Sequence, residues 1–252
     1  MNQTQPQITN QCQTLELFRE DAYLQTCKAH VLEAVAAGKC TGLVLDQTVF
    51  YAEGGGQPGD SGSLMLGDGS KIGVTNTIKH RGGTGILHVL AADSRIPAVG
   101  SEVTCQINWD RMHKHMRLHS CLHLLCSLVD GGVTGGSIGA DKARLDFDLQ
   151  DTTLDKEHLT QEMNRLKTQA HPLQARWITE EEMQLQPELV RTMSVKPPSE
   201  EGRVRLMEFA DVDLQACGGT HVANTAEISA VRVGKIENKG KCNRRVNILF
   251  DK

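Results

Sequence analysis

The segment at residues 109–129, WDRMHKHMRLHSCLHLLCSLV, constrains the fold of this chain more than any other. Four of its apolar residues recur at spacings of four, three and four, which is typical of a helix that is buried along one side. These residues are Leu118, Leu122, Leu125 and Val129. We therefore expect one long helix whose apolar face packs on a protein core.

Two histidines of this helix lie one turn apart. Because His119 and His123 are four residues apart, their imidazoles point the same way from the helix. Such a pair can chelate one metal ion, with both Nε2 atoms at about 2.0–2.1 Å from a Zn²⁺. An isolated His-x-x-x-His pair, however, more often consists of two half-buried packing residues. Further ligands from elsewhere in the chain are needed to favour a metal site.

Length and charge limit the classes of protein that this chain can belong to. Its 252 residues suffice for one large or two ordinary domains, and we expect two. The net charge of −4 means that any RNA contact must come from a local basic patch. Aromatic residues make up only 4% of the chain, which argues against a base-stacking platform for single strands.

The sequence contains no evident targeting segment. Its start, MNQTQPQITNQCQ, lacks the basic and apolar regions of a signal peptide, and no apolar run approaches the roughly 18 residues that span a bilayer. We therefore expect a cytoplasmic protein with no membrane partner. The cysteines show no Cys-x-x-Cys spacing, so we expect them to remain thiols and to serve mostly in packing. They are Cys12, Cys27, Cys40, Cys105, Cys121, Cys126, Cys217 and Cys242.

The first hundred residues contain short, regularly spaced apolar runs that predict strands. Their spacing indicates a small β-barrel or sandwich, and we place a domain boundary near residue 108, giving domains 1–108 and 109–252. The predicted strands cover residues 14–18, 40–50, 64–66, 72–78, 86–90 and 103–107. The stretch after residue 21 fits a further extended segment, with a helix as the alternative.

A glycine-rich loop, YAEGGGQPGDSG, follows the second of these runs directly. One interpretation of Gly54, Gly55 and Gly56 is a flexible turn. The other is that the glycines allow backbone N–H groups to approach a bound anion or ester. The segment alone does not decide between the two.

The residues after the long helix predict a mixed α+β layer. We expect a glycine-rich loop that contains Thr134 and Ser137, and then an alternating strand through Leu145 and Phe147. An amphipathic helix at 152–168 follows, and then strands at 173–178 and 204–209. Between these strands, Thr179 with Glu182 three residues later predicts a capped helix that ends near Pro187.

A second cluster of possible metal ligands lies in QACGGTHV. Cys217 and His221 are separated by two glycines, which predicts a tight loop in which both side chains can converge on one point. Together with His119 and His123 they provide one sulfur and three nitrogen atoms. This set suits Zn²⁺ and is poor for Mg²⁺ or Ca²⁺. The two clusters together therefore favour a zinc site over two coincidental motifs.

The order and spacing of HSCLH and CGGTH resemble the editing domain of alanyl-tRNA synthetase and its free-standing relatives, the AlaX-type editing proteins. FYAEGGGQPGDSG looks like the glycine-rich motif of that family's N-terminal β-barrel. INWDRMHKHMRLHSCLHLL resembles the entry to its editing domain, and DLQACGGTHVANTAEIS its second ligand segment. His119, His123, Cys217 and His221 match the family's zinc-binding positions. The threonyl-tRNA synthetase editing domain shares this layout, but GGTH after the cysteine is more similar to the alanyl type.

The resemblance implies an α+β fold, in which an N-terminal small β-barrel precedes a two-layer, zinc-containing editing domain. It also implies hydrolysis of the ester that joins a wrong amino acid, serine above all and glycine second, to alanine tRNA. Because the chain has no aminoacylation domain and no C-terminal tRNA-binding domain, we expect it to act in trans. The expected partner is mischarged tRNA, with no DNA and no membrane involved.

Several residues are candidates for this chemistry. Ser120, Cys121 and Leu122 stand where a HExxH metalloprotease has its glutamate, so a protease is disfavoured. Four protein ligands fill a tetrahedral zinc, so we expect the ion to orient the substrate rather than to activate water. We expect the catalytic hydroxyls of Thr134 and Ser137 to help to place water and substrate. Contacts to the substrate are expected from Gly54, Gly55, Gly56, Gln57 and Arg244.

Other functions are compatible with the same residues. A zinc-stapled tRNA-binding module without turnover, an enzyme that edits threonine tRNA and a small-molecule metallohydrolase are the alternatives. A basic stretch near the C-terminus suits phosphate contact, although such a stretch more often lies on a solvated hairpin. It consists of Lys235, Lys239, Lys241, Arg244 and Arg245.

Overall fold

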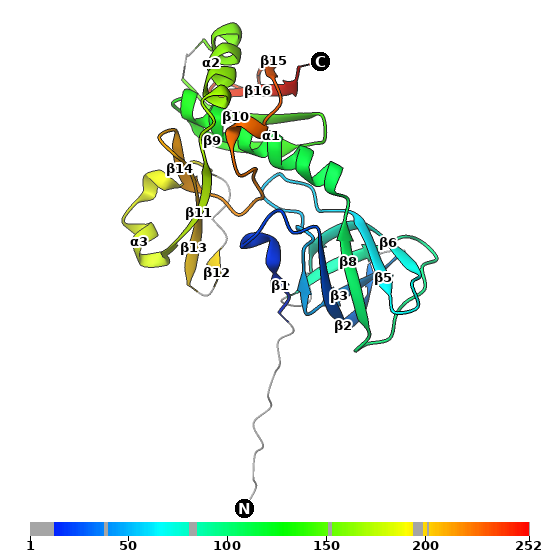
Figure 1. The fold of residues 1–252 in the computed structure, drawn as a ribbon. Helices are drawn as coiled ribbons and strands as arrows, with labels where there is room; N and C mark the ends of the chain where they lie inside the picture. The colour runs from blue at the N-terminus through cyan, green and yellow to red at the C-terminus, as the bar shows by residue number, and fades with distance from the viewer. Residues whose placement is uncertain are drawn as a thin grey trace, which may run out of the picture. The chain divides into compact units, whose positions relative to one another are not determined.

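The computed structural model describes residues 13–37, 40–80, 85–150, 153–193, 199–200 and 202–251 (Figure 1). Residues 1–12 lie outside the described residues. They include Cys12 and most of the N-terminal segment from which we expect that the chain has no signal peptide. Contacts divide the chain into two compact units. The first unit takes residues up to 17, 24–52 and 59–107, and the second takes 18–23, 53–58 and everything from 108 onward. Whether 1–108 and 109–252 fold as independent domains stays a prediction.

The first unit is a closed antiparallel barrel (Figure 1). Inward and outward residues alternate along its strands, as in β6, where Ile72 and Val74 are buried and a register shift after Val74 makes Thr77 the next buried residue. The predicted barrel is therefore confirmed. The strands follow the order β2 (Thr26–Ala37), β3 (Cys40–Leu45), β7 (Ile86–Leu90), β6 (Lys71–Lys79), β5 (Gly62–Leu66) and β8 (Glu102–Ile107).

Two short strands accompany the barrel. β1 (Leu15–Glu16) pairs in parallel with β4 (Gln47–Thr48). The expected strand at 14–18 is therefore shorter than predicted, because a 3₁₀ helix, η1 (Leu17–Arg19), follows at once. The predicted strand at 40–50 divides into β3 and β4, with Asp46 between them.

A histidine in the barrel core is buried without charge. His88 is fully buried, with its Nδ1 donating to the Leu43 carbonyl at 3.0 Å and its Nε2 2.7 Å from the Thr48 hydroxyl. The Thr48 hydroxyl in turn accepts the Phe50 N–H at 3.0 Å. Both ring nitrogens are thus satisfied by neutral partners. Burial lowers the pKa of His88 to about 4, so the imidazole is neutral at physiological pH.

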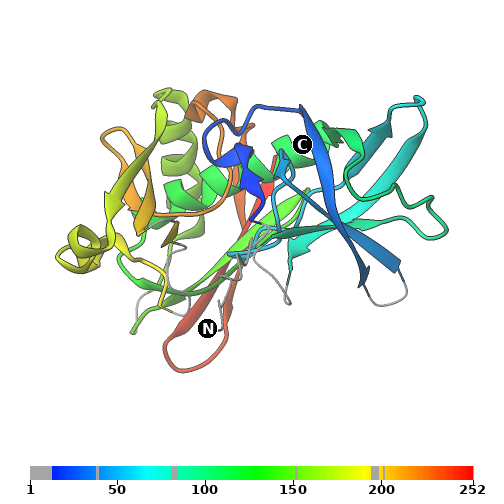
Figure 2. The ribbon, with the colours of Figure 1, turned by 90° about the horizontal axis from the view of Figure 1, so that it is seen from below.

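The second unit is built on a four-stranded sheet with the order β15, β16, β10 and β9. Helix α1 (Trp109–Leu128) packs on β10 and β9, and α2 (Lys156–Thr168) packs on β15 and on α1 (Figure 2). The sheet and its helices form the expected two layers, so the α+β fold class is confirmed. The strands are β9 (Gly132–Ile138), β10 (Lys142–Asp148), β15 (Val231–Asn238) and β16 (Asn243–Phe250).

The prediction of a glycine-rich loop before β10 is wrong, because these residues form strand β9. Glycine weakens a strand, but it also marks places where other groups approach the backbone closely. A Cβ on Gly132 would lie 2.6 Å from the Met193 sulfur, and one on Gly136 would lie 3.1 Å from Leu145. The ladder shifts register between Asp146 and Phe147. The prediction of a loop, which is based on glycine content alone, is therefore wrong for a strand that is closely packed.

Helix α1 is buried more completely than its apolar stripe predicted. Besides Leu118 and Leu125, residues on its other sides, such as Ser120 and Leu124, have no exposed surface. The expectation of burial along one side is wrong for the middle of the helix. The physical reason is that β9, β10, β14, α2 and η3 (Thr225–Glu227) all pack against it. At its start, Asn108 caps the helix by accepting the Arg111 N–H at 3.2 Å.

A second sheet completes this unit. Thr179 caps α3 (Glu180–Gln184) in a capping box with Glu182, as predicted, and η2 (Pro187–Leu189) follows. Helix α2 begins later than residue 152, with Asp155 as its cap, and residues 151–152 lie outside the described residues. The sheet contains β11 (Leu173–Thr179), β13 (Arg203–Phe209), β12 (Ser199–Glu200) and β14 (Asp213–Ala216). In the described part of the chain, no helix has both the length and the apolar character needed to cross a bilayer.

The stability of the barrel should depend on pH through His88. The pKa of a histidine is about 6.5 in an unfolded chain, so between about pH 6.5 and pH 4 the unfolded chain binds a proton that the folded barrel rejects. The free energy of unfolding should therefore fall by about 1–3 kcal/mol as the pH decreases through this window. Urea denaturation of the wild type and of His88→Gln at several pH values measures this. Equal pH dependence in both proteins would exclude His88 as its source.

Candidate functional site

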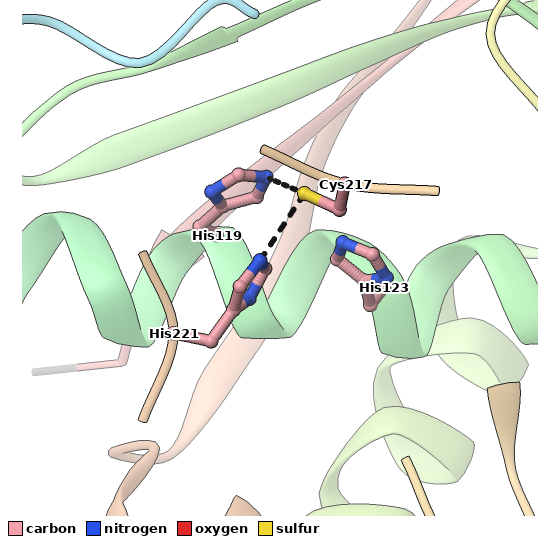
Figure 3. Close-up of side chains that lie close together, drawn as sticks. All are labelled: His119, His123, Cys217 and His221. Carbon is pink, nitrogen blue, oxygen red and sulfur yellow. Dashed lines mark hydrogen bonds between the residues drawn. The ribbon is translucent and has the colours of Figure 1, made fainter. Parts of the chain in front are cut away.

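The structure brings together the four residues that the sequence nominated as metal ligands. Helix α1 supplies His119 and His123, and the loop that follows β14 supplies Cys217 and His221 (Figure 3). One ligand atom of each residue lies within 4.8 Å of the ligand atoms of the other three. The CGGTH segment forms the tight loop that its glycines predicted.

The distances in this cluster fit a tetrahedral ion. The Cys217 sulfur lies 3.5 Å from His119 Nε2 and 3.2 Å from His221 Nε2. An ion with about 2.3 Å to sulfur and about 2.0–2.1 Å to nitrogen, at tetrahedral angles, would place the sulfur and each nitrogen about 3.5 Å apart. The three imidazoles are buried, with at most 9% of each residue exposed. The group can therefore hold a metal ion with little rearrangement.

The tautomer of His119 is fixed by Gln57. The Thr220 N–H donates to Gln57 Oε1 at 3.2 Å, which identifies this atom as the amide oxygen. Gln57 Nε2 donates to the Thr220 hydroxyl at 2.8 Å. His119 Nδ1 lies 3.0 Å from the same Oε1 and must therefore carry the proton. Its Nε2 consequently presents a lone pair toward Cys217, as a metal ligand requires.

The other two histidines are oriented in the same way by different groups. His123 Nδ1 donates to Asp213 Oδ2 at 2.9 Å, in a pair that is nearly inaccessible to water. Gln215 donates to the same carboxylate oxygen at 2.6 Å. His221 Nδ1 lies 3.3 Å from the Ser120 hydroxyl. Each imidazole thus has a separate outer partner at Nδ1, which is the usual arrangement around a bound metal.

Electrostatics in the cluster favour a thiolate. Burial raises the pKa of Cys217, but the nearby His119 and His221 outweigh it and bring this pKa well below 9.0. Burial brings the pKa of His221 well below 6.5. Burial also lowers the pKa of His123, but the hydrogen bonds to Asp213 and Cys217 outweigh this effect and raise it to about 9. A thiolate and a neutral imidazole are the forms that bind metal ions, so the binding forms of Cys217 and His221 are favoured, whereas His123 must lose a proton when a metal ion binds.

The loop that carries Cys217 is held in place by a buried arginine. Arg205, on β13, is 5% exposed and donates from Nη1 to the carbonyls of Cys217 at 3.1 Å and Gly219 at 2.9 Å. The Cys217 N–H donates to the Arg205 carbonyl at 3.1 Å. Backbone and side chain of one residue therefore fix the first half of the loop.

The segment at residues 18–23 braces the far end of the same loop. The Tyr23 hydroxyl lies 2.7 Å from the Glu227 carboxylate and accepts the Ala223 N–H at 2.8 Å. Trp109, the first residue of α1, contacts the Tyr23 ring and stacks on His113. These contacts connect the start of α1 with the residues just after His221.

The glycine-rich loop belongs to the second unit and packs on β9. Gly55 and Gly56 have φ angles of +57° and +82°, which favour glycine. The Gly56 carbonyl accepts the Ile138 N–H at 2.8 Å, and a Cβ on Gly56 would lie 2.7 Å from the Gly136 carbonyl oxygen. Gly54 pairs with Gln57 across the turn. The loop is thus a structured turn that delivers Gln57 to His119.

The two predicted hydroxyls lie on strand β9 and not in a loop. The Thr134 hydroxyl donates to the Asp146 carbonyl at 3.1 Å and accepts from Asn243 Nδ2 at 3.2 Å. Ser137 is exposed, and its Cα lies next to the position that a Cβ on Gly56 would take. Their roles in placing water and substrate stay predictions.

Arg244 stabilises the turn of the β15–β16 hairpin. Its Nη1 donates to Asn238 Oδ1 at 2.9 Å and to the Gly240 carbonyl at 3.2 Å. Elsewhere in the basic stretch, Lys239 pairs with Glu237 at 2.9 Å, and Arg245 makes two hydrogen bonds to Asp146. Several of these basic side chains therefore bind groups within the hairpin and its sheet. Contact of Arg244 with a substrate stays a prediction.

Sequence reasoning missed several residues that support the ligands. Ser120 was noted only as a residue that replaces the metalloprotease glutamate, and Asp213 and Arg205 were not singled out. Gln57 is fully buried and hydrogen-bonds His119, which its sequence context does not indicate, and its contact with a substrate stays a prediction. Each contacts the cluster from a different part of the chain, so no spacing in the sequence indicates them.

Comparisons with known proteins agree with this arrangement. A family model described as class II (A) tRNA synthetases matches residues 7–111. A second model, the threonyl and alanyl tRNA synthetase second additional domain, matches residues 204–247, which include Cys217 and His221. The fold and the ligand cluster thus define a protein of the class that contains this second additional domain.

Relatives that align with this chain over nearly their full length identify a family within this class. The alanyl-tRNA editing protein AlaX-M of Methanosarcina acetivorans is 34% identical over 91% of this chain and 96% of its own length. AlaX-M of Saccharolobus solfataricus is 32% identical over 92% of this chain and 97% of its own length. An alanine–tRNA ligase of Pyrobaculum calidifontis is 35% identical over 89% of this chain, which spans 25% of the ligase. The chain belongs to the family of alanyl-tRNA editing proteins.

Replacing Gly219 should disrupt the ligand cluster. A Cβ at this position would lie 2.2 Å from His119 Cε1 and 2.9 Å from Gln57 Oε1, so Gly219→Ala must displace the ligand or its outer partner. We expect metal affinity to fall at least 10-fold, in the range seen when outer partners of a ligand are lost. Competition with a chromogenic chelator measures this affinity. Gly67→Ala, where the added Cβ would have open space, is the matched control. Unchanged affinity in Gly219→Ala would contradict the geometry.

Proposed function

We propose that this protein is an aminoacyl-tRNA deacylase that hydrolyses mischarged alanine tRNA in trans, in the cytoplasm. The preferred substrate is the seryl ester, and the glycyl ester is second. The observation that carries this proposal is the buried group of three imidazoles and one thiol, in a chain aligned with an editing protein over 96% of that relative's length. Family membership indicates the class of substrate, and the buried group is the candidate active site.

We further propose that the cluster holds zinc. His119, His123, Cys217 and His221 would be the ligands, since nitrogen and thiolate donors in tetrahedral arrangement suit Zn²⁺. Such an ion supplies positive charge that orients an ester and its carbonyl oxygen. Four protein ligands leave little room for a metal-bound water, which favours orientation as its role.

Groups of the chain itself would place the water molecule and stabilise the developing oxyanion. An aminoacyl ester is already activated, so positioning of a water molecule and hydrogen bonding to the developing oxyanion suffice. Each such contribution accelerates a reaction by about 10²–10³. We assign these tasks to the hydroxyls of Thr134 and Ser137 and to backbone N–H groups of the glycine loop at Gly54–Gly56. Ser137 and Gly56 lie next to each other, which supports a shared task.

Selectivity for serine must come from a polar contact. Serine is larger than alanine by one oxygen atom, so a pocket that accepts serine cannot exclude alanine by size. A buried group that hydrogen-bonds the serine hydroxyl is left without a partner when alanine binds, and sites of this type discriminate by about 10⁴–10⁵. Thr134 is the candidate for this contact, in which case its bonds to Asp146 and Asn243 must rearrange.

Editing of threonine tRNA is the second candidate function. The matching family model covers threonyl as well as alanyl tRNA synthetases, so the family model alone leaves both tRNAs possible. The full-length relatives favour alanine. A tRNA-binding module without turnover would share the zinc site but would release no amino acid. Deacylation of a panel of mischarged tRNAs separates these alternatives.

The zinc site gives a direct prediction. Purified protein supplied with zinc should contain one equivalent per chain by elemental analysis. His123→Ala should lower occupancy because it removes a ligand, and Gln57→Leu should weaken affinity about 10–100-fold because it frees the tautomer of His119. Gln47→Leu, at a half-buried position in the first unit, is the control. A metal content far below one equivalent in the wild type would contradict the proposed site.

Deacylation tests the function itself. We expect rapid hydrolysis of Ser-charged alanine tRNA, slower hydrolysis of the Gly ester and almost none of the Ala ester. Thr134→Val removes the hydroxyl at nearly constant volume and should lower the Ser/Ala rate ratio by about 10-fold or more. Release of radiolabelled amino acid measures all three rates. Equal rates on Ser and Ala esters would refute the editing function, and an unchanged ratio in Thr134→Val would refute only the role of Thr134.

A further inference from the structure

Two cysteines face each other across the seam of the barrel. Cys27 on β2 and Cys105 on β8 are direct partners in the antiparallel ladder between these strands. Strands β2 and β8 are the first and last strands of the barrel in sequence, so their pairing closes it. Directly opposed residues in such a ladder have Cα atoms about 4.5–5.5 Å apart. This separation lies within the range that a disulfide bridge spans.

The two thiols contact each other and differ in their surroundings. The Cys105 thiol is fully buried, whereas Cys27 is half-buried. The hydrogen bond from Cys105 lowers the pKa of Cys27. The same contact, together with burial, raises the pKa of Cys105. The accessible member of the pair is therefore the better nucleophile, and the buried member is held as a thiol beside it.

The remaining cysteines with described side chains lack this arrangement. Cys121 and Cys126 are buried on α1, and Cys217 belongs to the candidate metal site. Cys242 is half-buried near the β15–β16 turn and belongs to the other unit. A cysteine that serves only to fill space would need no second thiol opposite it. The cross-strand register thus distinguishes Cys27 and Cys105 from the others.

We propose that Cys27 and Cys105 form a thiol–disulfide site whose oxidant is a low-molecular-weight disulfide. The Cys27 thiolate attacks one sulfur of the oxidant and expels the other as a thiolate, which leaves a mixed disulfide on Cys27. The Cys105 thiol then transfers its proton to the first expelled thiolate and attacks the Cys27 sulfur, which expels the second small thiolate; this thiolate takes up the proton that Cys27 had released to solvent. One external disulfide is reduced to two thiols, and one internal disulfide forms.

The product would lock the barrel. A bridge between Cys27 and Cys105 connects the strands that close it and encloses most of the first unit in one covalent loop. Closing a loop of this length restricts the unfolded chain more than the folded one. The oxidised protein should therefore have a Tm about 5 °C or more above that of the reduced protein.

The test uses the full chain with zinc present, which protects Cys217. The protein is titrated with oxidised glutathione, its free thiols are alkylated after unfolding in urea, and peptides are mapped by mass spectrometry without reduction. We expect a Cys27–Cys105 cross-linked peptide, lighter than the two reduced peptides by two hydrogen atoms, and a raised Tm. Cys242 is the internal control, and it should carry only a glutathione adduct.

Two single-cysteine variants test whether the cross-link requires Cys27. Cys27→Ser should leave Cys105 as an alkylatable thiol and abolish the rise in Tm, whereas Cys242→Ser should retain both the cross-link and the rise. If Cys27→Ser does not fold, peptide mapping of the wild type decides alone. The proposal is overturned if both thiols remain alkylatable when Cys242 is fully modified. It is equally overturned if Cys27 retains glutathione without a cross-link to Cys105.

Discussion

The second unit depends on the burial of three imidazoles around one thiol. Buried polar groups without partners destabilise a fold, and this cluster avoids the cost by giving every Nδ1 a separate partner. Gln57, Asp213 and Ser120 supply these partners. Because the Nδ1 atoms are occupied, the Nε2 atoms of His119 and His221 face Cys217. A site that can hold a metal ion thus follows from hydrogen-bond satisfaction in the core.

This requirement explains why distant segments of the chain meet in one unit. The turn at 53–58 leaves the barrel segment of the sequence to place Gln57 behind His119. The loop after β14 approaches the same ring so closely that Gly219 has no room for a side chain. These contacts add to the burial of helix α1 by the strands and helices that pack on it. The glycines of both motifs therefore serve close packing, which is compatible with a role next to the substrate.

The barrel follows a different principle. Its core is largely apolar, and polar groups within it, such as His88 and Thr48, satisfy each other. Its seam contains a pair of thiols, Cys27 and Cys105, in direct register. The two units therefore place their cysteines in opposite environments. One thiol is surrounded by imidazoles that favour metal binding, and the other pair is positioned for reaction with each other.

The sequence by itself determined a small β-barrel or sandwich, the long histidine helix, the capped helix α3 and the nomination of all four ligands, because each depends on local periodicity or on a spacing of a few residues. It failed at β9, where glycine content hid a strand, and it did not indicate that Gln57 contacts His119, which lies far away along the chain. Only the tertiary structure decided which groups stand behind the ligands and that Cys27 opposes Cys105. The physical reason is that such contacts depend on packing between segments, and one sequence contains no periodic signal for them.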